Sequence, residues 1–174
     1  VVVNGFGDAA TIAGAERELQ ALGAATMYHG ADMSRPSQIE DMVRAAESRF
    51  GRIDVLVNNA GIQHVAPVDE FPPAKWDAII AINLSSAFHT TRLALPGMKQ
   101  RGWGRILNIA STHGLVASAN KSAYVASKHG LVGFTKAVAL ETATTGITVN
   151  AICPGWVLTP LVQKQVDARA AADG

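Results

Sequence analysis

Short apolar runs alternate with amphipathic segments along the whole chain. The apolar runs are rich in β-branched residues and are continuous rather than alternating, which is typical of strands buried on both faces of a parallel sheet. They predict strands at Val1–Val3, Ala25–His29, Ile53–Val57, Arg105–Ala110 and Ile147–Ile152. The segments between them predict helices at Ala9–Leu22, Ser37–Phe50, Ala74–Arg101 and Ser122–Thr144. This order predicts an α/β fold with a Rossmann-type, doubly wound parallel sheet and right-handed crossovers.

Prolines and glycines near the helix ends agree with these boundaries, and the segments after the strands indicate where a functional site lies. Pro36 fits the first turn of the second helix, and four glycines lie just past helix ends, at Gly23, Gly51, Gly102 and Gly146. Ligands of parallel α/β sheets bind at the carboxyl ends of the strands. Polar or glycine-rich segments come directly after predicted strands at Asn58–Gly61, Ser111 and Pro154–Gly155. We therefore expect the functional site at that edge.

The composition bounds the class of protein. The chain has 174 residues, 48% of them hydrophobic and 17% charged, which predicts one domain over 1–174 with a packed core. Its 15 basic and 14 acidic residues are spread along the chain, so we expect no nucleic-acid partner. Cys153 is the single cysteine, which fits a cytoplasmic protein, and we predict that it is a buried apolar residue. No stretch is long and apolar enough to predict a membrane span. The histidines lack the spacing of a metal site, and we interpret His29 and His64 as structural.

Tyr124 and Lys128 form the strongest chemical signal. They lie four residues apart in a predicted helix, so their side chains project from the same face. A free tyrosine keeps its proton until pH ~10, and a nearby cation favours the phenolate. Ser111 closes an apolar strand thirteen positions before the tyrosine. The three side chains together predict a device that moves a proton on and off an alcohol.

These motifs resemble the short-chain dehydrogenases/reductases. The resemblance extends over essentially the whole chain and includes Asn58-Asn59-Ala60-Gly61, Asn83, Ser111, Tyr124, Lys128 and Pro154-Gly155. Further segments resemble the family members that oxidise D-3-hydroxybutyrate in ketone-body metabolism, namely Gln63-His-Val-Ala-Pro67, Ser111-Thr-His113, Lys121 and Gly155-Trp-Val-Leu-Thr-Pro160. The resemblance therefore implies NAD-dependent, reversible oxidation of a small 3-hydroxy acid.

The resemblance also implies roles for individual residues. Tyr124 is the expected base for alcohol oxidation, Ser111 binds the substrate oxygen, Lys128 supports the tyrosine and binds the nicotinamide ribose, and Asn83 bends its helix and holds a water. The cofactor-binding set comprises Phe6, Asp32, Asn59, Ala60, Gly61, Tyr124, Lys128, Pro154, Gly155, Val157 and Thr159. The substrate-binding set comprises Gln63, Ser111, His113, Lys121, Tyr124, Trp156 and Gln165, with Leu115 beside the methyl group. For Asp32, a capping role at the helix near Pro36 is the alternative to adenine binding.

The two ends depart from the family pattern. Family members carry a Thr-Gly-x3-Gly-x-Gly turn that holds the pyrophosphate, and the nearest run here is Gly5-Phe-Gly7. We therefore expect the first βα unit and the C-terminal helix and strand to be absent from this chain, and Leu161–Arg169 to form a helix. NAD is favoured over NADP because no cation follows the first predicted strand and Asp8 would repel a phosphate.

The apolar helices around Asn83 and Tyr124 favour an oligomer, and the resemblance implies a homotetramer. Three alternatives to the main hypothesis stay open. The protein could be another reductase of the same fold, such as an NADPH-dependent 3-oxoacyl reductase. It could also be a non-catalytic dinucleotide-binding protein, or an inactive fragment.

Overall fold

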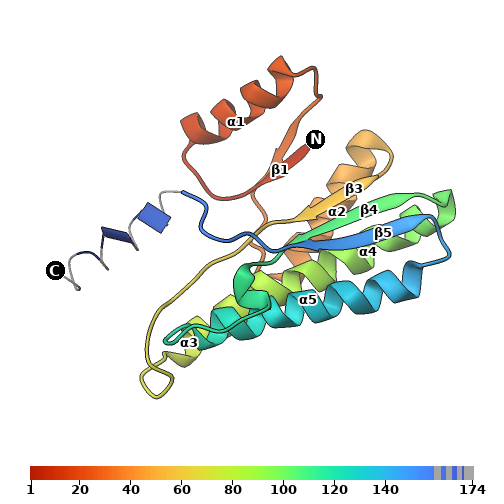
Figure 1. Ribbon diagram of the computed structural model, residues 1–174. Coiled ribbons are helices and arrows are strands. Elements are labelled where there is room, and N and C mark those ends of the chain that lie inside the picture. Colours follow the sequence, from red (N-terminus) through yellow and green to blue (C-terminus); the bar gives the residue numbers. More distant parts are fainter. Residues whose placement is uncertain (159–161, 164–165, 168–169, 171–174) are drawn as a thin grey trace.

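The computed structural model describes residues 1–158, 162–163, 166–167 and 170, and it follows the predicted alternation of strands and helices (Figure 1). In chain order the elements are β1 (Val2–Asn4), α1 (Ala9–Ala21), β2 (Met27–His29), α2 (Pro36–Phe50), β3 (Val55–Asn58), α3 (Pro73–Ile80), the π-helical turn η1 (Ala81–Ser85), α4 (Ser86–Arg101), β4 (Gly104–Ile109), the short 3₁₀ turn η2 (Thr112–Gly114), α5 (Ser122–Thr142) and β5 (Ile147–Ile152). The strands and helices predicted up to Ile152 are confirmed to within two residues at each end. The long predicted helix from Ala74 is three consecutive segments, α3, η1 and α4.

All the strand pairs are parallel, as predicted, but they form two ladders rather than one. β1 pairs with β2, and β3, β4 and β5 form a three-stranded sheet in that order. Val57 lies opposite Leu107, and Ile106 lies opposite Val149. Within the described residues no backbone hydrogen bonds join the two ladders, so the single continuous sheet of the prediction is not observed here.

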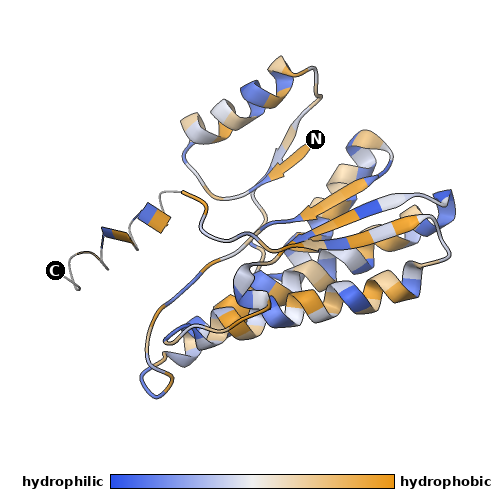
Figure 2. Ribbon diagram, viewed as in Figure 1, coloured by the Kyte–Doolittle hydropathy of each residue, from blue (hydrophilic) through white to orange (hydrophobic). Residues whose placement is uncertain are grey.

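The strands of the larger sheet are buried on one face only. β4 alternates between buried and half-buried residues, and β5 alternates over most of its length. The expectation of burial on both faces was wrong, because α4 and α5 pack on one side of this sheet while α1 lies on the other side against the smaller ladder (Figure 1). β3 is apolar over most of its length (Figure 2), yet Val55 and Val57 are each about half exposed. The hydrophobic core therefore lies between the β3–β5 sheet and the helices α4 and α5.

The predicted helix boundaries are confirmed by backbone geometry. Pro36 is the first residue of α2, and Gly51 ends that helix in the left-handed conformation, with φ of 78°. Gly146 leads from α5 into β5 with φ of 71°, and a Cβ atom there would lie 2.2 Å from the carbonyl oxygen of Gly102. Both the dihedral angle and the close approach therefore require glycine at this position.

Candidate active site

Helix α5 brings Tyr124 and Lys128 together on one face. The ammonium nitrogen of Lys128 lies 5.7 Å from the centroid of the Tyr124 ring and donates a 2.6 Å hydrogen bond to the carbonyl oxygen of Ile109 at the end of β4. The lysine is only 4% exposed. Burial lowers the pKa of Lys128 to about 8, while the neighbouring Cys153 thiol acts in the opposite direction. Cys153 itself is half-buried rather than fully buried, because it lies at the rim of the core next to this lysine.

Ser111 and His113 connect the end of β4 to the tyrosine. Ser111 is buried, and its Oγ accepts a 3.1 Å hydrogen bond from the backbone N–H of His113. The imidazole of His113 meets the Tyr124 ring edge to face, with 6.0 Å between the centroids. Since the serine oxygen accepts from the backbone, its own proton is available to donate to an oxygen atom in the site. Ser111, His113, Tyr124 and Lys128 therefore form a contact series, in which each residue lies next to the following one.

Asn83 fixes the loop after β3 against α5. It lies in the π-helical turn η1, and its side chain is 2% exposed. Its Oδ1 accepts from the N–H of Ile62 at 2.8 Å, and its Nδ2 donates to the Ile62 carbonyl at 2.9 Å and to Ser127 Oγ at 3.2 Å. The expected irregularity of this helix is present as a π-bulge, a feature frequent at functional sites. Protein acceptors occupy both N–H groups of the Asn83 amide, so a water held by this residue would have to bind its Oδ1 or its backbone.

The loops after β3 and β5 lie next to these residues. A Cβ atom on Gly61 would lie 3.7 Å from Asn83 Oδ1 and 3.8 Å from Lys128 Nζ, so this loop passes directly over the lysine. The backbone N–H of Thr112 donates to the Pro154 carbonyl at 2.9 Å. Asn59 and Ala60 precede Gly61 at the carboxyl end of β3, and Gly155 and Val157 follow Pro154 after β5. The expected cofactor loops are thus adjacent to Lys128 and to the serine turn.

The predicted substrate residues are brought together in part. Lys121 Nζ lies 5.7 Å from the centroid of the Trp156 ring. Burial, and then the positive charge of Lys121, lower the pKa of His113, so the imidazole is neutral near neutral pH. Gln63 has a buried Nε2 without a hydrogen-bond partner. Trp156 and Leu115 are 68% and 61% exposed, so within the described residues they border an open site.

Two predicted site residues, Thr159 and Gln165, lie outside the described residues. The expected helix at 161–169 also lies largely outside them, and only its separate described residues are helical.

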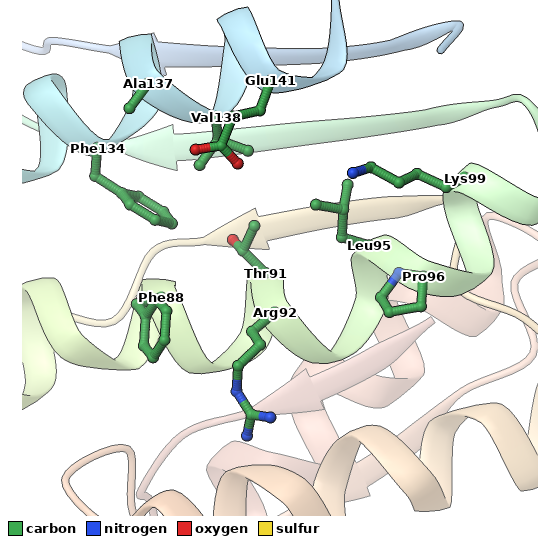
Figure 3. Close-up of a pocket in the computed structure, with 10 residues that line it drawn as sticks. All are labelled: Phe88, Thr91, Arg92, Leu95, Pro96, Lys99, Phe134, Ala137, Val138 and Glu141. Atoms are coloured by element: carbon green, nitrogen blue, oxygen red, sulfur yellow. The ribbon is translucent and has the colours of Figure 1, made fainter.

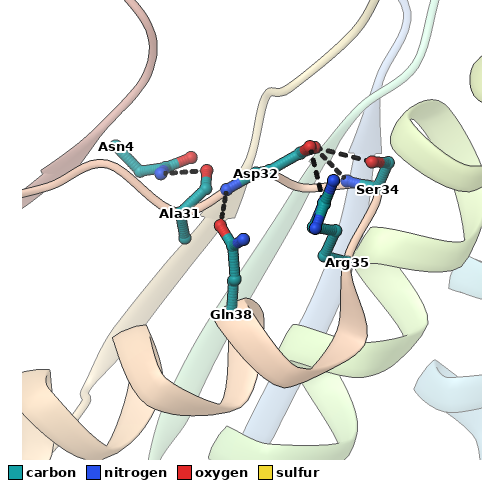
Figure 4. A network of polar contacts seen from close by, with 6 residues as sticks. All are labelled: Asn4, Ala31, Asp32, Ser34, Arg35 and Gln38. Carbon is teal, nitrogen blue, oxygen red and sulfur yellow. Dashed lines mark hydrogen bonds and ion pairs between the residues drawn. The ribbon is translucent and has the colours of Figure 1, made fainter.

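The predicted adenosine-binding residues lie on the smaller ladder. Phe6 is exposed in the loop between β1 and α1. Asp32 follows β2, and its Oδ1 accepts from the backbone N–H and from the hydroxyl of Ser34, while Arg35 lies 3.4 Å from its other oxygen (Figure 4). The N-cap of α2 is Arg35, so Asp32 closes the turn before the helix rather than capping it. The predicted capping alternative was therefore wrong, since the Asp32 carboxylate is engaged within the turn before the helix; adenine binding stays a prediction.

Sequence reasoning missed several buried polar residues around the site. Ser127 is fully buried and donates to the Tyr124 carbonyl while it accepts from Asn83. Asn108 is also fully buried, within the apolar strand β4. A polar residue inside an otherwise apolar strand was the signal that could have identified Asn108. Within the described part of the chain, no group of three or more His, Cys, Asp and Glu residues is placed to hold a metal ion, and no helix is long and apolar enough to cross a membrane.

Comparison with known proteins identifies the family. The model of the short chain dehydrogenase family matches residues 3–170 of this chain. The chain belongs to the short-chain dehydrogenase family. Among its relatives in this family, the D-beta-hydroxybutyrate dehydrogenase of Cupriavidus necator is 71% identical over 174 residues, which cover 100% of this chain and 67% of that protein. The D-beta-hydroxybutyrate dehydrogenase of Rhizobium meliloti is 57% identical and is matched over 68% of its length.

Solved structures of the short-chain dehydrogenase fold agree with this assignment. The F189W actinorhodin polyketide ketoreductase with NADPH is 41% identical with a TM-score of 0.91, and the match covers 98% of this chain and 66% of that one. A gluconate 5-dehydrogenase from Burkholderia cenocepacia, in complex with NADP and tartrate, is 33% identical with a TM-score of 0.86, over 95% of this chain and 65% of that one. This chain therefore spans about two thirds of the length of these four relatives.

Proposed function

We propose that the protein catalyses the reversible oxidation of D-3-hydroxybutyrate to acetoacetate with NAD. The observation that carries this proposal is the contact series Ser111–His113–Tyr124–Lys128 at the carboxyl end of the sheet. The identity of 71% to a D-beta-hydroxybutyrate dehydrogenase supports the choice of substrate. Asn83, Ser111, Tyr124 and Lys128 are the proposed catalytic residues.

The proposed proton transfer follows from the positions of these side chains. The Ser111 hydroxyl donates to the substrate oxygen, and the Tyr124 phenolate takes the proton from the substrate hydroxyl. Lys128, nearly buried beside the ring, stabilises the phenolate by its positive charge. The C3–H bond breaks as the C3–O bond becomes a carbonyl, and bound NAD supplies the hydride acceptor. In the reverse direction Tyr124 returns the proton to the alcohol.

The donors of this site fit the nicotinamide ribose half of a dinucleotide. Lys128 has three N–H donors, of which one reaches Ile109, so two are available to ribose hydroxyls. Backbone that can approach a ligand closely is supplied next to the lysine by Gly61 and beside Thr112 by Gly155. The residues that would hold NAD are Phe6, Asp32, Asn59, Ala60, Gly61, Tyr124, Lys128, Pro154, Gly155, Val157 and Thr159.

NAD is proposed over NADP because of the charge after β1. Asp8 caps helix α1 by accepting from the Thr11 N–H at 2.8 Å, and these Thr11 hydrogen bonds lower the pKa of Asp8, so it is ionised near neutral pH. No lysine or arginine occurs before Arg17. A 2′-phosphate near this turn would therefore be repelled by Asp8, and no lysine or arginine close by in the sequence could pair with it. Two structural relatives were solved with NADP or NADPH, so the test below compares NAD with NADP.

The substrate carboxylate is proposed to lie between Lys121 and His113. Lys121 supplies the positive charge, and neutral His113 supplies a hydrogen-bond donor beside Tyr124. Gln63 and Gln165 are proposed to complete this carboxylate site, with Trp156 as its wall. Such a site holds a small acid at a fixed distance from the reacting hydroxyl, which an acyl-carrier substrate of a 3-oxoacyl reductase would not need.

We further propose that the protein is a cytoplasmic homotetramer that associates through α4 and α5. A groove of about 420 Å³ runs between these helices (Figure 3), and it is lined by Phe88, Thr91, Arg92, Leu95, Pro96, Lys99, Phe134, Ala137, Val138 and Glu141. Phe88 is 47% exposed there and contacts Phe134 edge to face. A second copy of the same two helices would cover these rings.

The test is the initial rate of NADH formation by the full-length protein. D- and L-3-hydroxybutyrate are compared, each with NAD and with NADP. We expect turnover of the D acid to be at least about tenfold faster with NAD than with NADP, because Asp8 repels the 2′-phosphate. Dinucleotide binding without turnover of either acid would contradict the substrate while leaving the family intact. The absence of both would indicate an inactive protein.

A further inference from the structure

Two asparagines, half-buried Asn58 and fully buried Asn108, connect the strands of the sheet to the helices behind it. Asn58 Nδ2 donates to Asn108 Oδ1 at 2.8 Å, across the β3–β4 pair. On one side, Thr90 Oγ1 of α4 donates to Asn58 Oδ1 at 2.6 Å. On the other side, Asn108 Nδ2 donates to Thr135 Oγ1 of α5 at 2.9 Å. The four side chains form one hydrogen-bonded chain from α4 through both strands to α5.

This polar chain lies inside the core and is well satisfied. Asn108 is fully buried, and Thr90 and Thr135 are nearly so. The hydroxyl of Thr135 accepts from Asn108 and donates to the Leu131 carbonyl at 2.7 Å. Apolar side chains would fill the same space without desolvating amides, so stability alone does not account for these residues. A satisfied buried network instead specifies one relative position of the elements that it connects.

Three of the four members, Asn58, Asn108 and Thr135, lie on or next to segments that carry proposed active-site residues. Asn58 directly precedes the Asn59–Gly61 loop. Asn108 adjoins Ile109, whose carbonyl accepts from Lys128, and lies three residues before Ser111. Thr135 lies seven residues after Lys128, two helical turns along the same face of α5. The Asn108–Thr135 hydrogen bond and the Lys128–Ile109 hydrogen bond therefore join the same two elements, β4 and α5.

We propose that Asn108 and Thr135 are positioning residues for the catalytic lysine and tyrosine. Their hydrogen bond fixes the position of α5 along β4, and this position keeps the Lys128 ammonium at the Ile109 carbonyl and the Tyr124 ring against His113. The inference rests on the proposed function only for its kinetic test.

Thr135 has a matched control on the same helix. Thr142 lies seven residues further along α5, is fully buried, and donates its hydroxyl to the Val138 carbonyl at 2.8 Å, as Thr135 does to Leu131. Among the hydrogen bonds of the described residues, only Thr135 adds a bond to a strand. Thr135→Val and Thr142→Val therefore remove the same helical interaction, and the difference between them isolates the bond to Asn108.

The test measures kcat, KM and the thermal midpoint of both variants in the full-length protein. Both should lose stability, and Thr135→Val should lose more, because it leaves the buried Asn108 Nδ2 without its acceptor. Thr135→Val should lower kcat by about tenfold with KM for the acid little changed, because a small displacement of the catalytic groups slows the chemical step. Thr142→Val should keep the kcat of the unaltered protein, and Thr135→Ser, which restores a hydroxyl, should recover most of it. Equal kcat values for the two valine variants would overturn the proposal.

A structural measurement separates this inference from the proposed function. Crystal structures of the two valine variants should show the 2.6 Å bond from Lys128 to Ile109 kept in Thr142→Val and lengthened or broken in Thr135→Val. Retention of the bond in both would overturn the positioning role whatever the substrate. Failure of the unaltered protein to oxidise D-3-hydroxybutyrate would instead contradict only the proposed function. Thr135→Ala is the second variant if the valine variant does not fold.

Discussion

Lys128 places its ammonium nitrogen 5.7 Å from the centroid of the Tyr124 ring, one helical turn away on α5. The lysine is nearly buried and its remaining interaction is with the end of β4, so the cation cannot move far from the phenol. This arrangement differs from a solvated surface pair, in which water would screen the charge. The positive charge proposed to support Tyr124 is therefore held in the core rather than carried by a mobile side chain.

Removal of the Tyr124 hydroxyl should abolish turnover. In Tyr124→Phe no group remains to take the substrate proton, so we expect kcat to fall by at least about a hundredfold while NADH binding, followed by fluorescence, is nearly intact. Tyr28→Phe is the matched control, since Tyr28 is the only other tyrosine of the chain and its exposed hydroxyl donates to Gly5. Activity above about a tenth in Tyr124→Phe would contradict the mechanism.

Removal of the Lys121 charge should weaken substrate binding. Lys121→Ala is expected to raise KM for D-3-hydroxybutyrate by about tenfold or more, with a smaller change in KM for NAD, because a charge-assisted bond to the carboxylate is lost. Lys75→Ala, at an exposed lysine on α3, controls for a general loss of positive charge. If both variants kept the original KM, Lys121 would not be part of the carboxylate site.

Neutralisation of Asp8 should relax the preference for NAD. Asp8→Ser keeps a side chain that can cap α1 and removes the charge, so the thermal midpoint should hardly change. We expect the ratio of kcat/KM for NAD to that for NADP to fall by about three- to tenfold, since the repulsion of the 2′-phosphate is lost. A ratio identical to that of the unaltered protein would show that Asp8 does not face the phosphate position.

The buried lysine should make stability depend on pH in a defined window. Its pKa in the folded state is about 8, below the ordinary value of 10.5, so between these values the unfolded state binds more protons. The destabilisation from burying the charge is fully present below about pH 8 and is relieved as the pH rises towards 10.5. The free energy of unfolding should thus rise over this window, relative to Lys128→Met, by at most roughly 3 kcal/mol. Denaturant titrations of both proteins from pH 7 to pH 10 measure this free energy of unfolding. The same pH dependence in both proteins would contradict the burial of a charged lysine.

A charge in the groove between α4 and α5 should disrupt assembly. Phe88→Asp places a carboxylate beside Phe134, where burial against a second copy would leave it unpaired. Light scattering should show a tetramer for the unaltered protein and a smaller species for the variant. Leu140→Asp is a control at a residue of α5 that is exposed and does not line the groove. An unchanged mass for Phe88→Asp would exclude this groove as the interface.

The sequence by itself determined the order of the elements and most of the candidate chemistry. Hydrophobic periodicity located the five strands and the regions of the long helices among the described residues, because buried strands and amphipathic helices have different periods, but it did not reveal the η1 and η2 turns. The four-residue spacing of Tyr124 and Lys128 was enough to place them on one helical face, since spacing along a regular helix fixes direction. The resemblance to the short-chain dehydrogenases rested on local motifs of the same kind, whose residue types and spacing can be read directly from the sequence.

Only the tertiary structure decided how these groups meet. The contact of His113 with Tyr124 depends on how η2 folds back on α5. The one-sided burial of β3–β5 depends on which helices cover the sheet. The bond between Asn108 and Thr135 joins residues 27 positions apart, and no local rule pairs an amide in a strand with a hydroxyl on a distant helix. Local sequence fixes local geometry, whereas side-chain partners across elements are set by packing, which depends on the whole chain at once.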